Sequence, residues 1–154
     1  MFSAILGIFG TLSHLLTMLP VLSFLLTAGF CSLSVDSLQK LAAADLRLQL
    51  TVLAAAPLTP YDVEVAETVR SRARQLRLLR EGHSLTLNSA HLTGRAVDLM
   101  LLKPDRTYDN DFDHYQNLSL MMKTMATLLG VDLIWGGDWP KFKDGPHFQL
   151  KPEK

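Results

Sequence analysis

The first 35 residues contain no Asp, Glu, Lys or Arg, and this absence constrains the fold more than any other feature of the sequence. All 15 basic and all 15 acidic residues lie from Asp36 onward, at a frequency typical of a soluble globular domain. A domain of about 120 residues is too small to bury a thirty-residue helix that is apolar on every side. The sequence therefore predicts an apolar segment at 1–35 and a folded domain at 36–154.

The apolar segment is longer than the roughly 20 residues that a helix needs to cross a bilayer, and it also exceeds the usual apolar core of a signal peptide. We predict that it forms an apolar helix that acts as a signal or a membrane anchor. Pro20 is expected to kink this helix. No Lys or Arg precedes it, so the positive-inside rule gives no orientation. A cleaved signal, a retained anchor and a reversibly inserted anchor all remain open.

The charge balance argues against a nucleic-acid-binding protein. The formal net charge is zero, whereas such proteins normally carry a basic excess. The arginine-rich stretch RSRARQLRLLR is flanked by Glu67 and Glu81, and we interpret it as the solvated face of a helix. A single cysteine excludes an intramolecular disulfide, and nothing indicates an obligate protein partner.

Apolar periodicity and turn residues predict helices and short strands in the charged part of the chain. We expect one or two helices at 36–56, further helices at 71–80 and 112–129, and strands at 63–69, 97–101, 131–135 and 147–150. These elements do not follow the regular strand–helix–strand rhythm of a parallel sheet. The expected fold is therefore a small α+β domain with an antiparallel sheet flanked by helices.

The stretch SAHLTGRAVD, from Ser89 to Asp98, is the first candidate for chemistry. Gly94 predicts a turn that leads into the strand at 97–101. On that strand Asp98 shares a face with Ala96 and Met100, while Val97, Leu99 and Leu101 share the other face. A carboxylate among apolar residues needs a cation or strong hydrogen bonds.

A second candidate segment is FKDGPH, in which Asp144 precedes His147 by three residues across a Gly-Pro turn. Two histidines and one carboxylate, with water in the fourth position, are typical of a catalytic zinc site. An additional Asp near that water suits a general base. On spacing alone, the alternative of ordinary structural histidines and aspartates remains open.

Together, SAHLTGRAVD and WGGDWPKFKDGPHFQL resemble the zinc peptidases that cut peptidoglycan stem peptides. This family includes D-alanyl-D-alanine carboxypeptidases and L-alanyl-D-glutamate endopeptidases, the latter found among phage endolysins. Its signature is Ser-x-His-x-x-Gly-x-Ala-x-Asp, followed later by an acidic residue shortly before a His. The chain matches every fixed position of this signature, at Ser89, His91, Gly94, Ala96, Asp98, Asp144 and His147. An Asp rather than a Glu before the last His favours the endopeptidase branch.

The resemblance implies a role for each matched residue. His91, Asp98 and His147 would bind Zn²⁺, and Asp144 would be the catalytic base. Ser89 would belong to the substrate-binding region, where its more direct task would be to fix the loop around His91.

A segment further upstream, VEVAETVRSRARQ, also resembles the family. By that similarity Arg70 and Gln75 would face the substrate, and Arg70 could bind a stem-peptide carboxylate. Two positions depart from the family, because Ala90 stands where many relatives have Arg, and Thr68 where they often have Gly. These departures concern substrate contacts and a local turn rather than the metal ligands.

The function implied by the resemblance is zinc-dependent hydrolysis of a stem-peptide bond, as in an endolysin. The alternatives are a D-alanyl-D-alanine carboxypeptidase, a non-catalytic zinc-stabilised cell-wall-binding domain, and membrane perturbation by the apolar segment itself. The expected partners are the peptidoglycan stem peptide and, through the segment at 1–35, the membrane. We expect a membrane-anchored or exported protein whose domain faces the cell wall; the alternative is a cytoplasmic location until lysis.

Overall fold

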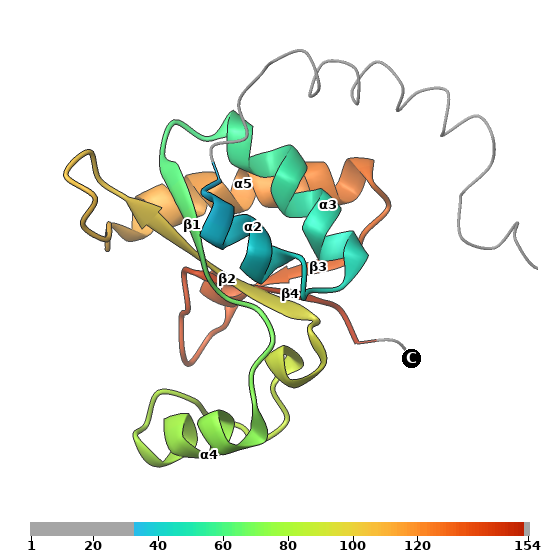
Figure 1. Ribbon diagram of the computed structural model, residues 1–154, viewed down its shortest axis with the longest axis vertical. Helices are drawn as coiled ribbons and strands as arrows, with labels where there is room; N and C mark the ends of the chain where they lie inside the picture. The colour runs from blue at the N-terminus through green and yellow to red at the C-terminus, as the bar shows by residue number, and fades with distance from the viewer. Residues whose placement is uncertain (1–32, 153–154) are drawn as a thin grey trace, which may run out of the picture. The chain divides into compact units, whose positions relative to one another are not determined.

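The computed structural model describes residues 33–152, which form an antiparallel sheet covered by helices (Figure 1). The strands are β1 (Asp62–Glu67), β2 (Ala96–Leu102), β3 (Leu133–Trp135) and β4 (His147–Leu150), in the spatial order β1-β2-β4-β3. The helices are α2 (Val35–Leu41), α3 (Leu46–Ala55), α4 (Arg72–Arg80) and α5 (Phe112–Leu128). Short 3₁₀ helices lie at η1 (Ala56–Leu58), η2 (Ala90–Thr93) and η3 (Gly136–Asp138). The predicted α+β class, with a small antiparallel sheet flanked by helices, is confirmed.

Several element boundaries differ from the expectation for identifiable reasons. The segment at 36–56 forms two helices, because Asp45 caps α3 by accepting a hydrogen bond from the Arg47 N–H. The strand expected from Val131 begins at Leu133 instead. Gly130 adopts a positive φ of 68°, and the Val131 N–H still bonds back to the Ala126 carbonyl at 2.8 Å, so Val131 completes the end of α5.

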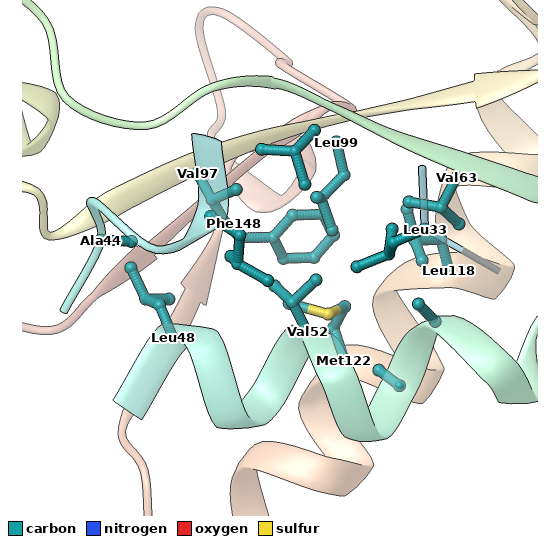
Figure 2. Packing of buried hydrophobic residues seen from close by; sticks show 14 of the residues in the cluster. Leu33, Ala44, Leu48, Val52, Val63, Val97, Leu99, Leu118, Met122 and Phe148 are labelled. Carbon is teal, nitrogen blue, oxygen red and sulfur yellow. The ribbon is translucent and has the colours of Figure 1, made fainter. Parts of the chain in front are cut away.

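The core lies between the sheet and helices α2, α3 and α5. Figure 2 shows Phe148 of β4 among side chains of β2 and the helices, including Val97, Leu99, Val52 and Met122. Because side chains alternate along a strand, the residues between these core positions point to the opposite face of the sheet. The face of the sheet that points away from the core is therefore available for polar side chains.

The described part of the chain begins just before the boundary predicted at Asp36. Leu33 is buried in the core, and the Ser34 side chain caps α2 by accepting from the Ser37 N–H. Within residues 33–152, no helix combines the length and the apolar character required to cross a bilayer. The predicted apolar helix, the signal or anchor and the membrane contact fall at 1–32, outside the described residues, and stay predictions.

Helix α4 and the loop that follows it extend away from α2, α3 and α5 (Figure 1). The Ser71 side chain caps α4 by accepting from the Arg74 N–H. Arg72, Arg77 and Arg80 are exposed on this helix, as expected for a solvated arginine-rich face.

Candidate metal centre

Sheet register brings two of the predicted ligands together. Asp98 on β2 lies directly opposite His147 on β4 in the antiparallel pairing. Their neighbours Val97, Leu99 and Phe148 are fully buried in the core, so Asp98 and His147 point to the other face of the sheet. The expectation that Asp98 lies on the face opposite Val97 and Leu99 is confirmed.

The third predicted ligand, His91, is delivered by η2 rather than by an extended loop. Ser89 caps this short helix, with its Oγ accepting from the His91 N–H at 3.3 Å. Gly94 ends it with a positive φ of 68°, and a Cβ there would lie 3.1 Å from the Ala43 carbonyl. The conformation and the close contact both favour glycine, and the resulting turn leads directly into β2.

The three side chains converge on a single point. The His91 Nε2, His147 Nδ1 and Asp98 Oδ1 atoms form a triangle with sides of 3.1, 3.1 and 3.2 Å. His91 is 1% exposed and His147 is 6% exposed. Among the described residues, this is the group of His, Cys, Asp and Glu side chains whose geometry could hold a metal ion.

Outer hydrogen bonds determine which ring nitrogens face inward. The Nδ1 of His91 lies 2.7 Å from the Thr68 carbonyl, which can only accept, so His91 donates there and presents the lone pair of Nε2. The Nε2 of His147 lies 3.0 Å from Gln149 Oε1, and donation to that oxygen leaves the lone pair of Nδ1 facing inward. Two lone pairs and a carboxylate oxygen therefore meet within 3.2 Å, an arrangement that a cation would stabilise.

The dimensions and charge of this pocket fit zinc. Tetrahedral ligand atoms held about 2.0–2.1 Å from Zn²⁺ are about 3.3–3.4 Å apart, close to the observed triangle. Burial opposes ionisation of Asp98, but His147 and His91 outweigh it and lower the pKa of the Asp98 carboxyl. Burial likewise opposes protonation of His147, but Asp98 outweighs it and raises the pKa of His147. Both shifts are typical of a pocket that stabilises positive charge.

We expect Gln149→Leu to weaken zinc binding by about 10- to 100-fold, because His147 would lose the acceptor that orients its ring. Competition with a chromophoric chelator measures this affinity directly. Gln149→Glu is the matched control, since a carboxylate retains the acceptor and should preserve the affinity. Unchanged zinc affinity in Gln149→Leu would show that the contact does not support the site.

Asp144 lines the same open cleft as the three ligands, which has a volume of about 1220 Å³. It is not a member of the metal-binding group, and within residues 33–152 its carboxylate accepts no hydrogen bond. Burial, followed by the negative charge of Asp98, raises the pKa of the Asp144 carboxyl. A carboxylate with a raised pKa and free oxygens is suited to accept a proton.

Arg70 and Gln75 belong to a network that supports the site. The Arg70 guanidinium donates to Glu67 at 2.9 Å, to Gln75 Oε1 at 2.9 Å, and to Asp98 Oδ2 at 3.4 Å. Gln75 is 1% exposed, and its amide donates to Ser84 Oγ and the Thr86 carbonyl. The structure thus shows both side chains engaged within the protein, and direct substrate contact by Arg70, Gln75 or Ser89 stays a prediction.

Three supporting residues were missed by the sequence reasoning. Gln149 had a signal, since it lies two residues after His147 and therefore on the same face of β4. Glu67 is paired with Asp98 through a register shift after Val65, which the sequence does not reveal. Thr68, regarded only as a departure in a turn, orients His91 through its carbonyl and donates its hydroxyl to the Lys40 carbonyl.

Three ligand atoms facing a cleft, with a separate carboxylate beside them, define a candidate hydrolytic metal centre of the metallopeptidase kind. The family model described as phage L-alanyl-D-glutamate peptidase matches residues 29–150. The chain belongs to this family.

Individual relatives agree with this assignment. The peptidoglycan L-alanyl-D-glutamate endopeptidase CwlK of Bacillus subtilis strain 168 is 34% identical over 113 residues, covering 64% of this chain and 66% of that protein. The L-alanyl-D-glutamate peptidase of Listeria phage A118 is 33% identical over 89 residues, covering 58% of this chain and 30% of the phage protein. The chain therefore spans less than two thirds of the length of each of these two relatives.

A solved structure shares the fold. The crystal structure of the L-Ala D-Glu endopeptidase ChiX of Serratia marcescens superposes with a TM-score of 0.71 at 35% sequence identity. The match covers 76% of this chain and 87% of that chain.

Proposed function

We propose that this chain is a zinc-dependent L-alanyl-D-glutamate endopeptidase that hydrolyses the stem peptide of peptidoglycan. The observation that carries the proposal is the triangle of inward-facing ligand atoms, with Asp144 in the same cleft. Family membership and the activities for which the relatives are named support the choice of substrate.

In this proposal His91, Asp98 and His147 hold Zn²⁺. The bound metal would supply Lewis-acid polarisation of the scissile carbonyl and a lowered pKa for the attacking water. Arg70 holds the second carboxylate oxygen of Asp98, at 3.4 Å, and so restrains the carboxylate with Oδ1 directed at the two histidines.

Asp144 is the proposed general base. Its carboxylate takes a proton from the attacking water and later delivers a proton to the leaving amine. The raised pKa of Asp144 favours the first step, because a more basic carboxylate accepts a proton more readily. A purely structural zinc site would need no such residue, so the position of Asp144 argues against a non-catalytic binding domain.

The test is digestion of purified peptidoglycan by the zinc-loaded full chain, followed by identification of the newly exposed groups. An endopeptidase exposes D-glutamate amines, which an amine-reactive label followed by mass spectrometry detects. Release of free D-alanine would instead identify a D-alanyl-D-alanine carboxypeptidase. Bound zinc without either product would overturn the enzymatic proposal in favour of a cell-wall-binding domain.

The proposed substrate lies outside the cytoplasmic membrane, so the domain must reach it by export or after lysis. Export or anchoring through the segment at 1–35 is part of the proposal and rests on its apolar, uncharged sequence. Fusing this segment to a reporter tests it, since a wholly cytosolic reporter would favour release at lysis.

A further inference from the structure

We propose that Trp135 is a positioning residue for Asp144, acting through the hydrogen bond from its indole N–H to the Gly145 carbonyl. This inference rests on the proposed role of Asp144 as the base. It concerns how the chain positions the Asp144 carboxylate, which accepts no side-chain hydrogen bond among residues 33–152.

Packing fixes the orientation of the Trp135 ring. Trp135 ends β3, is 3% exposed, and stacks on Phe112 with ring centroids 5.5 Å apart and on Phe148 at 6.5 Å. Its Nε1 donates to the Gly145 carbonyl at 2.7 Å in a buried setting. A ring packed against two aromatic neighbours points this donor in one direction, so the bond restrains the residue that follows Asp144.

A second hydrogen bond holds Asp144 from the other side. The Asp144 N–H donates to the Gly136 carbonyl at 3.1 Å. The contact is close, because a Cβ on Gly136 would lie 2.6 Å from the Asp144 carbonyl oxygen and 3.0 Å from the His147 Cβ. A third bond runs from the His147 N–H to the Asp144 carbonyl at 3.3 Å. The Asp144 backbone is thus held by its own N–H and carbonyl and, one residue further on, by the Trp135 indole at Gly145.

These backbone bonds fix the position of Asp144, since its carboxylate accepts no hydrogen bond among residues 33–152. The bond at Gly145 is the shortest of the three, at 2.7 Å, and it is the one that a side chain donates. A general base needs carboxylate oxygens that are free to accept a proton, so its position must be fixed by hydrogen bonds of the backbone instead. His91, Asp98 and His147 make no hydrogen bond to Trp135, and His147 is held separately by its strand pairing with Asp98 and by Gln149. Losing the indole donor should therefore displace Asp144 while leaving the ligands in place. A displacement of about 1 Å can lower a rate by about 100-fold.

The experiment compares Trp135→Phe with Val52→Ala in the full, zinc-loaded chain. Trp135→Phe keeps an aromatic ring but removes the donor, and we expect kcat to fall by about 10-fold or more, with KM and zinc affinity unchanged. Val52→Ala removes buried methyl groups on α3 but keeps the donor and both of its aromatic neighbours, so it should lower Tm with kcat within about threefold of the parent. Equal losses of kcat in both variants would reduce Trp135 to a packing residue and overturn the proposal.

Amide hydrogen exchange provides a readout that does not depend on activity. Trp135→Phe should speed exchange of the Asp144 amide relative to Val52→Ala, while the β2 amides keep their protection in both variants. Unchanged exchange at Asp144 would also overturn the proposal. If the parent chain hydrolyses no peptidoglycan, the proposed function fails, yet the exchange comparison still decides whether Trp135 holds this backbone.

Discussion

Replacing Asp144 by Asn is expected to lower kcat for peptidoglycan hydrolysis by about 10²–10⁴-fold while zinc stays bound. Asn has nearly the same shape as Asp but cannot take a proton from water. Zinc should be retained because Asp144 lies outside the group formed by His91, Asp98 and His147. The measurements are kcat on purified peptidoglycan and zinc content by elemental analysis of the same preparation.

Asp138→Asn is the matched control on the same loop. Asp138 is exposed and pairs with Lys123 at 2.7 Å, and exposed ion pairs contribute little to stability. Its kcat should stay within about threefold of the parent. Activity in Asp144→Asn equal to that of the control would refute the role of Asp144 as base, and loss of zinc would make Asp144 a ligand instead.

Removing the metal with a chelator should abolish hydrolysis and lower Tm by about 10 °C relative to protein with free zinc at 100 times its Kd. The physical reason is that zinc binds the folded site, where two histidine lone pairs and the Asp98 carboxylate converge within 3.2 Å, and binds the unfolded chain far less. Activity and differential scanning calorimetry, before and after zinc is added back, measure both effects.

Asp98→Asn provides the control for this experiment. It removes the anionic ligand, so its Tm should be nearly the same with and without the chelator. Full activity in parent protein that elemental analysis shows to be free of metal would contradict the zinc mechanism. A Tm that falls equally in Asp98→Asn would show that the chelator acts elsewhere on the protein.

Much of the candidate site could be predicted from local sequence. Alternation around Asp98 placed its carboxylate opposite Val97 and Leu99, and strand alternation depends only on neighbouring residues. The turn at Gly94 was likewise expected from the chain itself, and its positive φ of 68° bears this out. The motifs around His91 and His147 indicated candidate ligands, although their convergence was an inference from family resemblance rather than from spacing.

Other features depended on contacts that local patterns do not encode. His91 lies in a 3₁₀ helix that Ser89 caps, and β3 begins at Leu133 because Val131 completes the end of α5. Helix ends and extended backbone differ little in energy at such positions, so local sequence does not predict these boundaries. For Arg70 and Gln75, the family resemblance implied that they face the substrate, which stays a prediction, whereas only the fold showed that their polar groups bond to Glu67, Ser84 and Thr86.

By itself, the sequence determined the α+β class, the uncharged composition of residues 1–35 and the residue types of the candidate site. Only the tertiary structure decided how these residues meet. The pairing of Asp98 with His147 joins residues 49 apart, and the Thr68 carbonyl reaches His91 across 23 residues. Local patterns report which face a side chain takes, but such long-range contacts depend on sheet register and loop packing, which form only when the whole domain folds.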